Sequence, residues 1–411
     1  MLLKVIISTA LILIGLWSLC AWIRLDPPAS VLLTLPKMLY MSFIAPILVI
    51  YLVLLLAYSF AFLYLSFNEH PIDSFYFFSY LLLWLYTLVG FIYCDFIRHA
   101  PINGNPLNPL HEKIINKKFL PKKLSFTTSD FTSQKSAKQF ILYTPSEGKH
   151  KETCLFYLNY EEWSVPSNIK SSLYLRDLAL KEGYSFCIYG GKTKEETHLP
   201  GMVTDIQEAL TCLKIKTPLS RFILCGGSAG AHLALVAAFS NTQPQIFAPF
   251  PLQVHGVIAL YPTVNLTEHY IYFTCKDEAS KSFLDHMGDA FFRLMMKDKP
   301  RTLGEASKKI MTQLVGGPYE SLAPIYEGAS IRNMLTEKDI PVLLVHGSHD
   351  SHIPVEPTRE LYELMKAQHK TVDYLELPFV EHAFDSLNVN HSVVGHKVKR
   401  EISNWLYTYF R

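Results

Sequence analysis

The stretch that decides the fold is LCGGSAGAH, residues Leu224–His232, in which one serine stands among glycines. Residues 226–230 fit the pattern G-x-S-x-G, whose small neighbours allow a tight turn that exposes the serine oxygen. That turn must follow a strand and open a helix, and the flanking apolar runs RFIL and HLALVAAF suit these roles. The alternative is an ordinary glycine-rich turn, so the rest of the chain must supply chemical partners for Ser228.

Two such partners follow later in the chain. A serine hydroxyl becomes a good nucleophile when a base takes its proton and a third group holds the base. In a strand–turn–helix setting the expected order is serine, acid, histidine. Asp350 follows the apolar run in PVLLVHGSHD, and His382 lies in FVEHAFD, directly after VDYLELP. The sequence therefore predicts a catalytic triad of Ser228, Asp350 and His382 at three strand ends.

Other residues compete for these roles. Asp350 could instead cap a turn before a helix that begins near Pro357. Three histidines compete with His382 as the base, but they lie too close to Asp350 in sequence to approach from a separate loop: His346, His349 and His352. We interpret His232 as a helix-face residue, and Asp205 as a packing or helix N-terminal residue rather than a proton carrier.

The surrounding chain alternates between short apolar runs and helical patterns. The apolar runs lie at 139–145, 153–160, 184–190, 221–227, 256–262, 341–347 and 372–378. The helical patterns lie at 171–181, 202–214, 229–239, 357–368 and 396–409. Runs that are continuously apolar are typical of parallel strands covered on both faces. The sequence predicts an α/β fold with a mostly parallel, doubly wound sheet.

One segment, 265–338, breaks this rhythm. It is rich in methionine and charge, and we predict a helical lid inserted over the carboxyl end of the sheet, where such sheets bind ligands. Its apolar residues suit either an acyl pocket or plain packing of the lid onto the core: Phe283, Met287, Phe291, Phe292, Leu294, Met295 and Met296.

The N-terminal quarter has a different composition. The chain has 411 residues, of which 49% are hydrophobic, and few charges occur before residue 98. Crossing a membrane takes about 20 apolar residues, and three stretches qualify: Val5–Ile23, Leu39–Phe67 and Ser74–Ile97. The first could instead be a cleaved signal peptide. We predict an all-α membrane segment with three transmembrane helices at 1–98, a polar linker at 99–137 and the α/β domain at 138–411.

Basic residues set the expected orientation of this multi-pass membrane protein. Arg24 and Lys37 flank the first link between apolar stretches, and Arg98 opens a run of basic residues after the third. By the positive-inside rule, the α/β domain is expected on the cytoplasmic side. The net charge of +2, with no basic stripe, argues against a nucleic-acid partner. Seven cysteines without a Cys-x-x-Cys pair predict neither a disulfide framework nor a zinc site.

From about Lys138 to Phe410 the chain resembles the α/β-hydrolase superfamily, particularly the hormone-sensitive-lipase-like carboxylesterases. The matching stretches are GGSAGAHLAL, HGSHDSHIP, EHAF and LPGMVTDIQEAL. The resemblance implies the same triad as the spacing, ester hydrolysis through an acyl-enzyme on Ser228, and no metal or other cofactor.

The chain departs from this family at one place. The family has His-Gly-Gly at the end of an early strand, where backbone N–H groups approach the oxyanion, whereas this chain reads NYEEW at 159–163. We expect the Ala229 N–H to be one oxyanion donor and a hydroxyl or backbone N–H of Tyr160 to be the other. Trp163 keeps the family's aromatic position, and we expect it to contact substrate together with Gly227.

These features favour a membrane-anchored serine hydrolase that cleaves a lipophilic carboxylic ester. Two alternatives stay open. The altered NYEEW stretch would also suit a weak or inactive hydrolase-fold adaptor at the membrane, and an amidase or peptidase would use the same triad.

Overall fold

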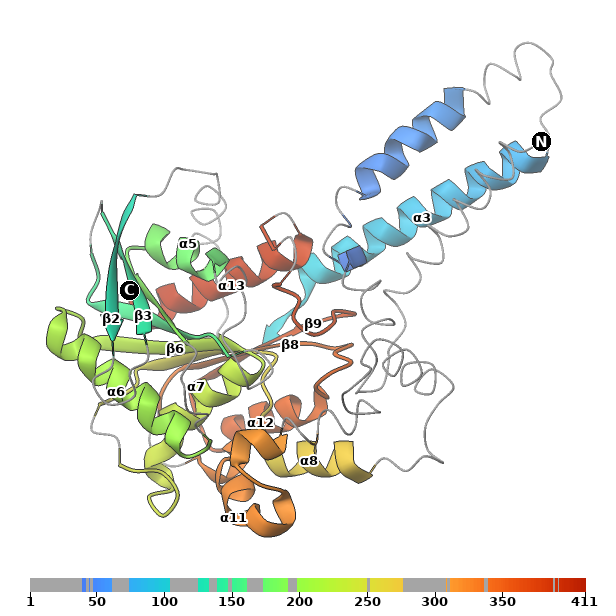
Figure 1. Ribbon diagram of the computed structural model, residues 1–411. Helices are drawn as coiled ribbons and strands as arrows, with labels where there is room; N and C mark the ends of the chain where they lie inside the picture. The colour runs from blue at the N-terminus through green and yellow to red at the C-terminus, as the bar shows by residue number, and fades with distance from the viewer. Residues whose placement is uncertain are drawn as a thin grey trace, which may run out of the picture.

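The structure is a computed structural model (Figure 1). It describes residues 39–41, 44, 47–60, 74–103, 125–132, 139–146, 150–160, 173–190, 198–249, 252–275, 308, 311–335, 339–386, 389–390 and 392–411.

A nine-stranded sheet forms the centre of the molecule, in the order β1-β9-β8-β7-β6-β4-β5-β3-β2. The strands are β1 (Ile102–Asn103), β2 (Phe126–Thr132), β3 (Gln139–Pro145), β4 (Thr153–Leu158), β5 (Ser185–Tyr189), β6 (Arg221–Gly227), β7 (Gly256–Leu260), β8 (Val342–Gly347) and β9 (Val372–Leu377). The six from β4 to β9 run parallel, while β1, β2 and β3 pair antiparallel with their neighbours. The predicted mostly parallel sheet is confirmed.

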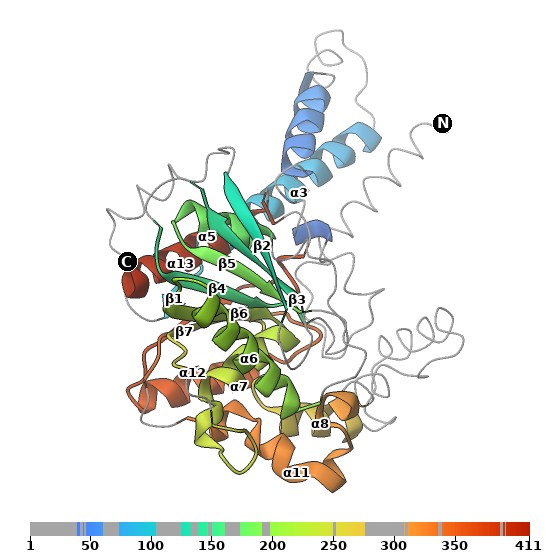
Figure 2. The same cartoon turned by 60° about the vertical axis from the view of Figure 1, so that its left-hand side comes forward.

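Helices cover both faces of the sheet (Figures 1 and 2). One face carries α6 (Gly201–Lys216), α7 (Ala229–Phe239), α8 (Leu266–Cys275), α11 (Tyr319–Gly328) and α12 (Glu356–Ala367), and the other carries α5 (Leu173–Lys181) and α13 (Val393–Phe410). Successive strand residues alternate between the two cores: Phe222 and Leu224 belong to the first, Ile223 and Cys225 to the second. Burial of both faces explains the continuous apolar runs in the sequence.

Two N-terminal helices project from the body and pack on each other (Figure 1). They are the helix Ile47–Phe60 and α3 (Ser74–His99), and a contact between the rings of Tyr51 and Tyr86 joins them at 6.3 Å. Within the part of the chain that the structure describes, one helix is long and apolar enough to cross a membrane, at Phe77–His99. The predicted first span, Val5–Ile23, lies outside the described residues.

The predicted linker at 99–137 needs correction, because it contains part of the sheet. Strand β2 forms the outer edge and pairs with β3 over its whole length, and β1 pairs with β9 at the opposite edge. The sequence of β2, FTTSDFT, is polar because most of its side chains are exposed. An exposed edge strand therefore lacks the apolar pattern by which we identified the other strands. The described parts of the predicted lid, α8 and α11, are helical as expected.

Candidate active site

Ser228 lies at the sharp turn between β6 and α7. Its φ of 53° is in the left-handed region, and its N–H donates to the Leu260 carbonyl of β7 at 2.9 Å. Helix α7 leaves this turn so close to β4 that a Cβ atom on Gly230 would lie 2.1 Å from the carbonyl oxygen of Leu158. Only glycine fits there, which explains the last glycine of the G-x-S-x-G pattern. The turn leaves Ser228 partly exposed at the carboxyl end of the sheet.

The three predicted triad residues come together there. His382 Nε2 lies 3.2 Å from Ser228 Oγ, and His382 Nδ1 lies 2.7 Å from Asp350 Oδ2. Asp350 follows β8 and His382 follows β9, so neighbouring parallel strands bring both residues to the same edge as Ser228. An Nδ1–H that donates to Asp350 leaves Nε2 free to accept the serine proton.

Asp350 is buried and its two oxygens are saturated with donors. Oδ1 accepts the backbone N–H groups of His352 and Ile353 at 2.9 and 2.8 Å. Oδ2 accepts from His382 and also from His346 Nε2, which lies at 3.1 Å, while Thr358 donates to His346 Nδ1 at 3.0 Å. His346, which competed for the role of base in the sequence, thus lies behind the acid and supports it.

These contacts shift the ionisation of the acid and the base in opposite directions. Burial alone would raise the pKa of Asp350, but the charges and hydrogen bonds of His382 and His346 lower it well below its usual value. Burial alone would lower the pKa of His382, but the Asp350 carboxylate outweighs this and raises it above the usual 6.5. Asp350 therefore stays ionised and favours the imidazolium form of His382 that proton abstraction produces.

The expected oxyanion donors are partly described. Ala229 is the first residue of α7, so its N–H has no acceptor within the helix and lies next to the serine. The Tyr160 carbonyl accepts the N–H of Gly230 at 3.2 Å. This bond places the end of β4 beside the sharp turn at Ser228, which we call the elbow. The Tyr160 ring packs in the core, 6.4 Å from that of Tyr189. The backbone N–H of Tyr160 is thus a better candidate for the oxyanion donor than the Tyr160 hydroxyl. Glu161, Glu162 and Trp163 lie outside the described residues.

Three other histidines that the sequence analysis considered contact groups other than the Ser228 hydroxyl. The His352 ring stacks on His382 at 5.1 Å, and burial lowers the pKa of His352 to about 4. His349 lies edge-on to the Phe379 ring at 5.2 Å. His232 is buried in α7, and its Nδ1 lies 2.6 Å from the Thr263 carbonyl. Asp205 is buried within α6, which agrees with a packing role.

A second buried carboxyl lies behind His382, which the sequence analysis missed. Asp385 accepts hydrogen bonds from Tyr261 Oη at 2.5 Å and Tyr174 Oη at 3.0 Å. The Tyr261 ring meets that of His382 edge-on at 4.7 Å. A Cβ on Gly227 would lie 2.4 Å from the Tyr261 hydroxyl, so Gly227 packs on this network. The only sequence signals were that Tyr261 lies near the end of a predicted strand and that Asp385 follows His382 by three positions.

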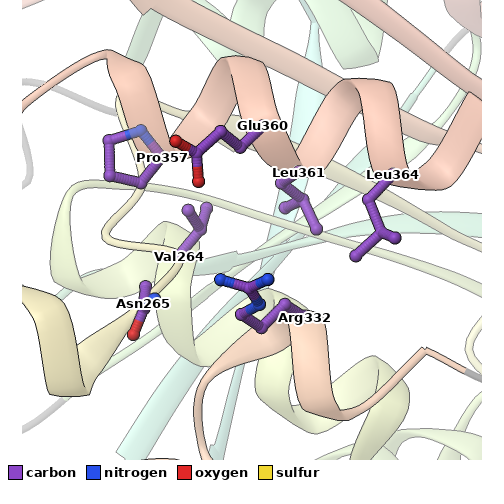
Figure 3. A pocket seen from close by; sticks show the side chains of 7 residues that line it. All are labelled: Val264, Asn265, Arg332, Pro357, Glu360, Leu361 and Leu364. Carbon is purple, nitrogen blue, oxygen red and sulfur yellow. The ribbon is translucent and has the colours of Figure 1, made fainter.

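Figure 3 shows a hollow between α12 and the region around Asn265 and Arg332. It contains no triad residue and is lined by Val264, Asn265, Arg332, Pro357, Glu360, Leu361 and Leu364. All seven apolar lid residues that the sequence suggests for an acyl pocket, from Phe283 to Met296, lie outside the described residues.

Comparisons with known proteins agree with this architecture. A probable carboxylic ester hydrolase, LipM of Mycobacterium tuberculosis, is 25% identical over 199 residues, 46% of this chain and 39% of that protein. Esterase LipC of the same organism is 27% identical over 170 residues, 40% of this chain and 35% of that protein. This chain thus spans well under half the length of these two relatives. The crystal structure of an esterase of the bacterial hormone-sensitive lipase family superposes with a TM-score of 0.50 at 16% identity, covering 78% of this chain and 97% of that one.

The family comparison covers more of the chain. The BD-FAE family profile matches residues 141–365, more than half of the 411 residues. The matched range contains β4 to β8, the elbow with Ser228 and the acid Asp350, while His382 follows it. With the fold, the strand order and the elbow in agreement, the chain belongs to the BD-FAE family of α/β-hydrolases.

Proposed function

We propose that the protein is a serine hydrolase that cleaves a carboxylic ester through an acyl-enzyme on Ser228. The observation that carries this proposal is the chain of contacts from Ser228 Oγ to His382 Nε2 at 3.2 Å and from His382 Nδ1 to Asp350 at 2.7 Å. The two mycobacterial relatives, a probable ester hydrolase and an esterase, support the same reaction class.

The geometry supports a two-step reaction. His382 takes the Ser228 proton as the oxygen attacks the ester carbonyl, and the tetrahedral intermediate then collapses as His382 returns that proton to the departing alcohol. A water molecule, deprotonated by His382, next attacks the acyl-enzyme, and His382 returns this proton to Ser228 Oγ as the acid is released. Asp350 stabilises the imidazolium in both steps, and its buried position makes that stabilisation strong.

The negatively charged oxygen of the tetrahedral intermediate requires hydrogen-bond donors. We assign the Ala229 N–H as the first, because it opens a helix and lies next to the nucleophile. The backbone around Tyr160 is the proposed source of the second, since this strand end is hydrogen-bonded to Gly230. Loss of one such donor lowers the rate by about 10²–10³.

A fluorophosphonate probe tests the reaction class. We expect the full-length protein in detergent to be labelled, Ser228→Ala to be unlabelled, and Ser321→Ala, which changes an exposed serine, to be labelled like the wild type. Labelling that survives in Ser228→Ala would place the nucleophile elsewhere. A folded wild type that is never labelled would favour the second candidate, a non-catalytic adaptor, for which the NYEEW stretch is the supporting observation.

We further propose that the protein is an integral membrane protein with three spanning helices and a cytoplasmic catalytic domain. The apolar helix Phe77–His99 supports one of these spans. The protein is expected to stay in the membrane pellet after alkaline carbonate washing. Release by that wash would contradict the proposal.

We propose a lipophilic substrate, and the position of the site supports this. Phe96 of α3 contacts Phe379, three residues before the catalytic histidine, so the site lies close to the apolar helices. We expect kcat/KM on p-nitrophenyl esters to rise from acetate to octanoate. Equal values along the series would argue against a lipid-like substrate, and faster hydrolysis of matched p-nitroanilides would favour an amidase.

A further inference from the structure

The loop that carries the catalytic histidine has an unusual backbone. It follows β9 and spans residues 379–385, and we call it the histidine loop. Phe379 has a φ of 63° and Ala383 a φ of 50°, both in the left-handed region that disfavours residues other than glycine. Such conformations persist only where the surroundings hold them. The contacts of this loop therefore decide where His382 stands.

One side of the histidine loop is held by the loop of the catalytic acid. Glu381 is fully buried and its Oε2 accepts the N–H of Ser351 at 3.0 Å and the Ser351 hydroxyl at 2.7 Å. Ser348 Oγ accepts the N–H of Phe379 at 2.8 Å. These bonds join the acid and the base through neighbouring residues.

The other side is held by α3 and by Met41, which precedes the helix Ile47–Phe60. The rings of Tyr93 and Phe96, one turn apart on α3, lie 6.4 and 5.6 Å from the ring of Phe379. The N–H of Glu381 donates to the sulfur of Met41 at 3.3 Å. Tyr93, Met41 and Glu381 are each at most 3% exposed, so this contact is part of the core and not a surface touch.

We propose that α3 and Met41 are part of the catalytic unit, in which Met41, Tyr93 and Phe96 hold the histidine loop so that His382 stays in line with Ser228. They are positioning residues, since none of them contacts the reacting atoms. This inference rests on the proposed function. If the helices only anchored the protein, they would not affect the hydrolysis of a small water-soluble ester, which needs no membrane for its delivery. We expect that this hydrolysis also depends on the contacts of Met41, Tyr93 and Phe96.

The outward faces of the helix Ile47–Phe60 and of α3 are apolar, which favours the bilayer as their neighbour. Large apolar side chains there are 47–72% exposed: Val49, Ile50, Val53, Leu56, Phe60, Phe78, Leu81, Trp84, Leu85 and Leu88. Lipid would cover this surface, while Tyr93 and Phe96 of α3 stay on the histidine loop.

A matched pair of phenylalanines on α3 tests the proposal in the full-length protein in detergent. Phe96 and Phe91 are both 50% exposed, but only Phe96 has a ring contact with Phe379. We expect Phe96→Ala to lower kcat for p-nitrophenyl acetate by roughly 10- to 100-fold with little change in KM, because small displacements of a catalytic group have effects of this size. Phe91→Ala should match the wild type, and Phe96→Leu should restore part of the rate.

Two further measurements separate positioning from a loss of folded protein. Titration with a fluorophosphonate counts the active sites, so that kcat refers to intact enzyme. The acid limb of the pH profile should move to lower pH in Phe96→Ala, because a displaced His382 loses part of its contact with Asp350. The same effects are expected for Met41→Leu, which keeps the volume but removes the sulfur acceptor.

The proposal is overturned if Phe96→Ala retains the kcat and the pH profile of Phe91→Ala. It is equally overturned if activity falls only in proportion to the titrated sites while the acid limb stays in place. A wild type that neither hydrolyses the ester nor reacts with the probe would instead refute the proposed function, so the two failures are distinguishable.

Discussion

Replacing Tyr261 by phenylalanine tests the carboxyl network behind His382. The substitution keeps the ring that meets His382 at 4.7 Å and removes the hydroxyl that donates to Asp385 at 2.5 Å. Asp385 is 1% exposed, so water has little access to replace the lost donor. A hydrogen bond to a charged group contributes about 1.5–3 kcal/mol. We expect the free energy of unfolding to fall by a similar amount, whereas kcat changes little because the ring remains.

The loss should depend on pH. Burial raises the pKa of Asp385 above its usual value, and the hydroxyls of Tyr261 and Tyr174 oppose this shift. A raised pKa means that Asp385 destabilises the fold increasingly as the pH rises from its unfolded-state pKa through its folded-state pKa. Without the Tyr261 hydroxyl the folded-state pKa rises further. Tyr261→Phe should therefore be more destabilised at neutral pH than in acid, where Asp385 is protonated in both states.

Urea unfolding of the full-length protein in detergent, followed by tryptophan fluorescence at both pH values, measures this effect. Tyr319→Phe is the matched control, because the Tyr319 hydroxyl donates to the exposed Glu327 at 3.0 Å. Its effect should stay within about 0.5 kcal/mol. Since Tyr261 and Tyr174 serve one carboxyl, the double variant should not be additive. The reasoning fails if Tyr261→Phe behaves like Tyr319→Phe, or if its loss of stability is the same at both pH values.

Three further predictions concern the triad and the elbow. Asp350→Asn should lower kcat on an ester by about 10⁴, because the amide favours the wrong tautomer of the base; a loss below tenfold would contradict the role of Asp350. The wild-type kcat/KM should rise with pH through a midpoint above 6.5, because the pKa of His382 is raised and only its neutral form accepts a proton; a midpoint at or below 6.5 would count against the Asp350 contact. Gly230→Ala, whose methyl would lie 2.1 Å from the Leu158 carbonyl, should abolish fluorophosphonate labelling, whereas Gly317→Ala meets only movable side-chain atoms and should label normally.

The sequence predicts the parallel part of the sheet well, for a physical reason. Each of these strands is covered on both faces, so its residues are apolar without interruption, and the predicted runs agree with the observed strands to within a few residues. The triad could be predicted because residues at the carboxyl ends of parallel strands share one edge, so that the order along the chain is enough to suggest proximity. The α/β-hydrolase fold is thereby confirmed, and the roles of the three residues stay predictions.

Features that depend on contacts across the fold could not be predicted. Strand β2 is polar because it lies at an exposed edge, and only its pairing with β3 identifies it. The contact of His346 with Asp350 depends on how the loop after β8 folds back towards that strand. The network of Asp385 joins residues separated by 124 and 211 positions in the chain. The contact of α3 with the histidine loop likewise links segments that no local pattern connects.

Backbone strain shows why so many distant elements meet at this site. Five residues other than glycine have a positive φ among those that the structure describes, and four of them lie around His382: Ser228, Tyr261, Phe379 and Ala383. Each such conformation costs about 1–3 kcal/mol, so the site is stable only if its surroundings compensate. The elbow is compensated by the packed α7 and β7, and Tyr261 by its bond to Asp385. Phe379 receives its packing from His349 and from Tyr93 and Phe96 of α3. Part of the compensation therefore comes from α3, which supports our proposal that the packing of this helix contributes to the geometry of the site and not only to its location.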